Sequence, residues 1–174
     1  MTATSTSNKP AVRRNVLYGV LAVLLVALDQ WSKSLVLANL GSGRPVTVLP
    51  GILQFRYVQN TGAAFSVLTG KTLALSIVTA AILILAVVLL LLDKVPGRWN
   101  QIALVLMIAG GAGNLIDRIV RHYVVDFIEV LFTDFAVFNV ADCCVTVGAA
   151  ILILSALVSF VKESKNQKEL ENDD

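Results

Sequence analysis

Four long apolar stretches divide this chain, and short polar segments separate them. The stretches cover residues 16–38, 72–92, 101–116 and 139–161. The second of them, 72–92, contains no charged residue. At 1.5 Å rise per residue, a helix of that length spans roughly 30 Å, the thickness of the hydrocarbon core of a bilayer. The pattern therefore predicts four transmembrane helices.

Residues 40–70 do not follow this pattern. Glycine and proline recur there, and the runs 46–49 and 52–58 are rich in β-branched and aromatic residues, which favours strands. The sequence Asn60-Thr61-Gly62 that follows is typical of a turn. The predicted fold class is an all-α polytopic membrane protein with four transmembrane helices and a small extramembrane β-sheet on the outer face.

The two ends of the chain are polar. Residues 1–15 and the charged segment 162–174 are expected to be disordered tails. Arg13-Arg14 before an apolar run is similar to a secretory signal, but no small-residue cleavage site follows, so 16–38 is expected to be retained. Four spans place both termini on one side, and the modest excess of Lys and Arg there predicts that this side is cytoplasmic.

Composition supports the membrane interpretation and excludes other classes. The chain is 56% hydrophobic and 15% charged, with a mean hydropathy of +0.78, which is too apolar for a soluble domain. A net charge of +2, without a basic stripe, argues against nucleic-acid binding. Cys143 and Cys144 are adjacent, and His122 is the single histidine. We therefore expect no disulfide framework, no metal and no cofactor.

Two aspartates, Asp126 and Asp142, lie in strongly apolar sequence. A carboxylate there is costly unless it has a partner or a function. A carboxyl pair that shares a proton can activate a water molecule and protonate a leaving amine, which is aspartic protease chemistry. From spacing alone two alternatives stay open. One is a proton- or ion-coupled transporter, and the other is a small structural or assembly protein.

The surroundings of the two aspartates differ. Asn139 is the expected N-cap of the fourth helix, which places Asp142 at its third position in a capping-box arrangement. The helix dipole there favours the charged carboxylate. Asp126 lies between apolar residues, which favours the protonated form. We therefore predict that Asp142 is more often the anion and Asp126 more often carries the proton.

Further polar residues lie at helical spacing near the ends of two spans. Asp29 and Lys33 are four residues apart and share one helix face. Asn114, Asp117 and Arg118 are expected to end the third helix on one face. Each group has two interpretations. It is either an ion pair that marks the end of a span, or part of a polar site near the membrane surface.

The order of five motifs resembles that of the lipoprotein signal peptidases, also called signal peptidase II. The motifs are Asp29-Gln30-x-x-Lys33, Asn60-x-Gly62-Ala63-Ala64-Phe65, Gly110-Gly111 with Gly113-Asn114-x-x-Asp117-Arg118, Val125-Asp126-Phe127, and Phe138-Asn139-x-Ala141-Asp142. They cover nearly the whole chain, from the first span to the fourth. Any one of them alone would be a weak signal.

This resemblance implies an endopeptidase of the bacterial inner membrane that acts as a monomer among membrane lipids. Its substrates would be prolipoproteins that carry a diacylglyceryl cysteine, and it would cut just before that cysteine. The resemblance assigns Asp126 and Asp142 as the catalytic pair. It assigns supporting or substrate-binding positions to Asp29, Lys33, Asn60, Gly62, Asn114, Asp117, Arg118 and Asn139. It also implies a short surface helix, for which residues 61–68 are the candidate.

Overall fold

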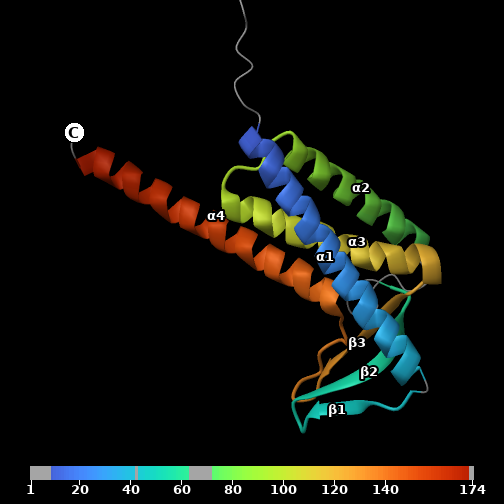
Figure 1. Cartoon of the computed structure of the whole chain (residues 1–174). Coiled ribbons are helices and arrows are strands. Elements are labelled where there is room, and N and C mark those ends of the chain that lie inside the picture. Colours follow the sequence, from blue (N-terminus) through green and yellow to red (C-terminus); the bar gives the residue numbers. More distant parts are fainter. Residues whose placement is uncertain (1–8, 42, 63–71, 173–174) are drawn as a thin grey trace, which may run out of the picture.

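Four helices form the body of the protein, and a small sheet lies at one end of the bundle (Figure 1). The computed structural model describes residues 9–41, 43–62 and 72–172. The helices are α1 (Lys9–Leu40), α2 (Thr72–Leu91), α3 (Arg98–Arg121) and α4 (Val140–Asn172). Each contains a segment that is long and apolar enough to cross a membrane. The predicted fold class of four such helices with a small β-sheet is confirmed.

Helix α3 is the centre of the bundle, because it packs against α1, α2 and α4. Its apolar side chains Ala103, Val105 and Ala109 are buried. On α2, by contrast, Ala86 is the one buried residue, and most large apolar side chains are exposed. An apolar helix with so little protein contact is suited to lipid rather than water.

Glycines let α3 and α4 approach each other closely. A Cβ atom at Gly110 would collide with the backbone oxygen of Ala141, and a Cβ atom at Gly148 would lie 2.6 Å from the backbone oxygen of Ala103. Small residues at a helix crossing allow such backbone contact in a membrane.

The sheet has three antiparallel strands in the order β1 (Val46–Leu49), β2 (Leu53–Asn60) and β3 (Val124–Val130). The sequence predicted the first two strands, and both are present. It did not predict β3. The first four residues of β3 are all buried, so they lack the alternation that identifies a strand.

The helix ends differ from the prediction. Helix α1 begins at Lys9 rather than at residue 16, so residues 9–15 are helical and not a disordered tail. Proline is tolerated in a first turn, and Arg14 is anchored to Asp93 by an ion pair of 2.8 Å. Helix α3 extends to Arg121, past the polar residues expected to end it. The surface helix expected at 61–68 lies, apart from 61–62, outside the described residues.

The segment 162–172, expected to be disordered, continues α4 as helix. Its residues are mostly Lys, Glu, Gln and Leu, which favour helix, and extending an existing helix avoids the cost of nucleation. The start of α1 and the end of α4 both lie away from the sheet (Figure 1).

Candidate active site

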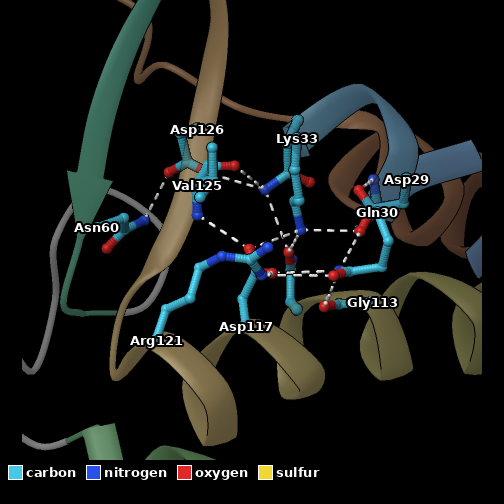
Figure 2. A network of polar contacts seen from close by, with 12 residues as sticks. Asp29, Gln30, Lys33, Asn60, Gly113, Asp117, Arg121, Val125 and Asp126 are labelled. Carbon is cyan, nitrogen blue, oxygen red and sulfur yellow. Dashed lines mark hydrogen bonds and ion pairs between the residues drawn. The ribbon is translucent and has the colours of Figure 1, made fainter. Parts of the chain in front are cut away.

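Asp126 lies in β3 and is 2% exposed. The antiparallel register pairs Asn60 with Val124, so Asn60 is the diagonal neighbour of Asp126 on the same face of the sheet. The Asn60 amide donates to Oδ2 of Asp126 at 2.9 Å, as Figure 2 shows. The Asn139 amide donates to Oδ1 of Asp126 at 2.7 Å. Both carboxyl oxygens of Asp126 therefore accept a hydrogen bond.

Asp142 lies in the first turn of α4. Its backbone N–H donates to Oδ1 of Asn139 at 3.0 Å, and the backbone N–H of Asn139 donates to Oδ2 of Asp142 at 3.1 Å. The capping box predicted from the sequence is therefore confirmed. The amide of Asn114 on α3 donates to the other oxygen of Asp142, Oδ1, at 2.8 Å.

Asn139 connects the two aspartates. It is fully buried, and its amide contacts Oδ1 of Asn114 at 3.1 Å as well as Asp126. A chain of hydrogen bonds therefore runs from Asp126 through Asn139 and Asn114 to Asp142. Because β3, α3 and α4 each supply part of it, the packing of these elements fixes the relative position of the two carboxyl groups.

A group of buried charges lies next to this chain of hydrogen bonds (Figure 2). Lys33 is fully buried, and its Nζ lies 2.8 Å from Oδ2 of Asp29, 3.2 Å from Oδ2 of Asp117 and 2.8 Å from Oδ1 of Asn114. These three contacts match the three N–H donors of an ammonium group. Oδ1 of Asp29 also accepts from the backbone N–H of Ala141 at 2.9 Å.

Asp117 connects the helices to the sheet. Its Oδ2 accepts from the backbone N–H of Val125 at 3.0 Å, beside Asp126, and its Oδ1 pairs with Arg121 at 2.5 Å. Gln30 donates to Oδ1 of Asp117 at 3.1 Å and to the backbone oxygen of Gly113 at 3.0 Å. The sequence did not single out Arg121 or assign Gln30 a role. Two features of the sequence could have identified them. Arg121 follows Asp117 by four residues, and Gln30 is next to Asp29.

These contacts bear on the two interpretations of the paired charges. Asp29 and Asp117 carry two negative charges, and Lys33 and Arg121 carry two positive charges. Asp29, Lys33 and Asp117 are at most 1% exposed. Asp29 and Lys33 therefore lie inside the protein, in contact with other elements, which favours the interpretation as part of a polar site. A buried, balanced group of charges holds α1, α3, β3 and α4 together.

The two aspartates line one cavity of about 590 Å³. Its polar lining also includes Asn60, Asn114 and Arg118, and its apolar wall comes from the loop before α4 and from the first turns of α4. The guanidinium of Arg118 donates to the backbone oxygen of Gly62 at 3.2 Å, and the N–H of Gly62 donates to Oδ1 of Asn60 at 2.9 Å. All of the predicted site residues are thus joined in one network.

Cys143 and Thr146 also line the cavity, and the sequence assigned neither a role. Thr146 lies four residues after Asp142, which would have placed it on the same helix face. Among the described residues, no group of three or more His, Cys, Asp or Glu side chains is arranged to hold a metal ion.

The environment of Asp126 changes its acidity. Burial raises the pKa of its carboxyl group from 3.8 to about 6. Hydrogen bonds from Asn60 and Asn139 favour the anion and oppose this effect, whereas the nearby charge of Asp142 raises the pKa further. At neutral pH, Asp126 is therefore much closer to its protonated form than an exposed aspartate is.

Comparisons with known proteins agree with this geometry. A family model described as signal peptidase (SPase) II matches residues 21–158. The lipoprotein signal peptidase of Streptococcus thermophilus (strain CNRZ 1066) is 40% identical over 141 residues, which cover 81% of this chain and 92% of the relative. That of Enterococcus faecalis (strain ATCC 700802 / V583) is 36% identical over 153 residues, which cover 87% of this chain and 95% of the relative.

Solved structures are similar as well. A bacterial membrane enzyme determined by the in meso method at 2.3 Å resolution superposes with a TM-score of 0.76 at 34% identity, and the match covers 83% of this chain and 89% of that one. A second, at 1.9 Å resolution, gives a TM-score of 0.73 at 34% identity, with 81% and 92% covered. The family resemblance found in the motifs is confirmed, and the chain belongs to the signal peptidase II family.

Proposed function

We propose that this protein removes signal peptides from prolipoproteins and that Asp126 and Asp142 are its catalytic pair. Membership of the family of lipoprotein signal peptidases supports the reaction class and the substrate class. The observation that carries the assignment of the pair is their position. Two carboxyl groups from different elements line one cavity and are joined through Asn139 and Asn114.

The chemistry requires one proton on the pair. Asp142, at the N-terminus of α4, is the anion that accepts a proton from a water molecule as the water oxygen attacks the scissile carbonyl carbon. Asp126, which has the raised pKa, donates its proton to the carbonyl oxygen. When the C–N bond of the resulting diol breaks, the proton held by Asp142 passes to the leaving amine, and a diol proton returns to Asp126.

The remaining residues of the network position the pair. Asn60, Asn114 and Asn139 hold the carboxyl oxygens. Arg118 lines the cavity and donates to the backbone oxygen of Gly62. Both residues are in position to contact the substrate backbone. The pairs Asp29–Lys33 and Asp117–Arg121 stabilise the packing of the elements that carry the aspartates. Lys33 also donates to Asn114, and its positive charge lowers the pKa of Asp126.

The arrangement suits a substrate that is itself in the membrane. Four apolar helices and the family make this protein a multi-pass bacterial membrane protein. We place both termini in the cytoplasm and the aspartates near the outer face of the cell membrane. The apolar wall of the cavity, which includes Val145 and Val147, faces the diacylglyceryl cysteine of a prolipoprotein, and the cut falls just before that cysteine. A single chain supplies every residue of the site, so a monomer suffices.

The test is cleavage of a diacylglyceryl-modified prolipoprotein by the purified protein and by Asp126→Asn and Asp142→Asn variants. Loss of an acid or base that takes part in proton transfer should lower the rate by at least about 100-fold. Asp134→Asn is the matched control, because Asp134 is an exposed aspartate on the loop between the pair and should be dispensable. Unfolding temperatures of all variants show whether the fold is retained.

Each result has a distinct meaning. Loss of cleavage in both variants, with full activity in Asp134→Asn, supports the pair. If one folded variant keeps most of its activity, the protein is a peptidase and the pair is wrong. If the folded parent never cuts, the proposal fails, and proton-coupled transport is the next hypothesis to test.

A further inference from the structure

A second polar site lies at the opposite end of the bundle. It is a cavity of about 750 Å³ between the first turns of α1 and the start of α3. We call it the basic hollow, and it is lined by Arg13, Arg14, Leu17, Tyr18, Gly97, Arg98 and Gln101. Neither the predicted site nor the proposed reaction uses any of these residues.

The basic hollow is about one membrane thickness away from the buried charges. Lys33 is 19 positions after Arg14 on α1, and Asp117 is 19 positions after Arg98 on α3. At 1.5 Å rise per residue, each segment is roughly 28 Å long, close to the hydrocarbon thickness of a bilayer. When the aspartates lie near one surface of the membrane, the basic hollow therefore lies at the headgroup level of the other leaflet.

The basic hollow has an excess of positive charge. Arg14 forms an ion pair with Asp93, whose Oδ1 also accepts from Gln101. Within the described part of the chain, neither Arg13 nor Arg98 has an anionic partner, and both are exposed. The Nε–H of Arg14 also has no acceptor among the described residues. Three guanidinium groups with one carboxylate leave two positive charges for an incoming anion.

The start of α3 adds free donors to the same place. Gly97 is the N-cap of α3, makes no side-chain capping bond and has φ of 83°. The first turn of α3 contains no acidic residue. The first backbone N–H groups of a helix lack partners within the helix and carry partial positive charge, which attracts phosphate. A helix N-terminus without a side-chain cap, next to three arginines, is suited to bind an anion.

The remaining wall of the basic hollow is apolar. Leu17 is 59% exposed and lies one turn into the membrane from Arg13 and Arg14. Tyr18 contributes its ring, and its hydroxyl donates to Oε1 of Gln101 at 3.1 Å. A free phosphate ion would leave this apolar surface uncovered, whereas the first segment of an acyl chain would cover it.

We propose that the basic hollow binds the phosphate headgroup of an anionic phospholipid in the leaflet opposite the aspartates. Guanidinium groups bind phosphate oxygens in bidentate geometry, and basic pockets between membrane helices are suited to such headgroups. The bound lipid would join α1 to α3 at the end of the bundle that lacks the buried ion pairs.

The test is lipid binding by the full purified chain, measured by native mass spectrometry from micelles that contain phosphatidylglycerol or phosphatidylcholine with identical acyl chains. The parent should retain phosphatidylglycerol in preference to phosphatidylcholine. The double variant Arg13→Gln/Arg98→Gln should bind phosphatidylglycerol roughly 10- to 30-fold more weakly, because each arginine near an anionic headgroup contributes about 1 kcal/mol. Both side chains are exposed, so the fold should be unaffected.

The matched control is Lys162→Gln/Lys165→Gln, which removes the same charge from exposed positions on α4 outside the basic hollow. Its affinity for phosphatidylglycerol should stay within about twofold of the parent, since the site itself is intact. Equal weakening in both double variants would mean general attraction by net charge and would overturn the proposal. So would equal retention of the two lipids by the parent, or displacement of phosphatidylglycerol by an equal concentration of inorganic phosphate.

Discussion

Replacing Lys33 by methionine tests whether the buried charges hold the site together. The ammonium group is fully buried and contacts Asp29, Asp117 and Asn114 at 2.8–3.2 Å. Methionine fills a similar volume but removes the positive charge and all three donors. Asp117 then keeps the cation of Arg121, whereas Asp29 loses its cationic partner.

The expected loss follows from these contacts. Removing one partner of a buried ion pair costs about 3–5 kcal/mol, because the remaining charge stays desolvated. Asp117 keeps Arg121 and the N–H of Val125, so most of the penalty falls on Asp29. For a chain of this length, 3 kcal/mol corresponds to a fall of at least about 6 °C in the unfolding temperature.

The assay is thermal unfolding in one detergent, followed by circular dichroism, for the parent, Lys33→Met and the exposed control Lys162→Met. The control should change the free energy of unfolding by less than about 0.5 kcal/mol. Adding Asp29→Asn to Lys33→Met removes the unpaired charge but leaves an oxygen to accept from Ala141. The double variant should therefore recover about 1–3 kcal/mol relative to Lys33→Met.

One result would refute this reasoning. If Lys33→Met unfolds at the temperature of Lys162→Met, the buried charges do not stabilise the packing of the helices. If the double variant is less stable than Lys33→Met, the penalty does not come from the unpaired carboxylate of Asp29.

Two further predictions concern the packing around Gly113 and the protonation of Asp126. Gly113→Ala places a Cβ atom 2.5 Å from Oδ2 of Asp29, so it should destabilise the protein by about 1–3 kcal/mol. In the same unfolding assay the control Gly19→Ala should be neutral or slightly stabilising, because a Cβ atom there has nothing within 4 Å. Asp126 loses its proton as pH rises through about 6, so cleavage should decline on the alkaline side. Asn60→Ala removes a hydrogen bond that favours the anion of Asp126, so the pKa of Asp126 rises and the decline in a pH–rate profile should move to higher pH. A shift to lower pH would contradict the assignment of Asp126 as the proton donor.

The sequence by itself determined the features that depend on near neighbours. The length and apolar character of four stretches define the four membrane helices. The Asp29–Lys33 pair and the Asn139–Asp142 capping box involve spacings of four and three residues, which helical geometry alone brings together. For these features the local pattern contains the physical cause.

Only the tertiary structure decided how these pieces combine. Strand β3 is defined by its pairing with β2, more than sixty residues earlier, and that pairing places Asn60 on Asp126. Lys33 on α1 reaches Asn114 on α3 beside Gly113, where a Cβ atom would collide with the side chain of Asp29. The raised pKa of Asp126 likewise comes from burial among these elements. Such contacts join residues distant in sequence, and no spacing in the chain encodes which of them will meet.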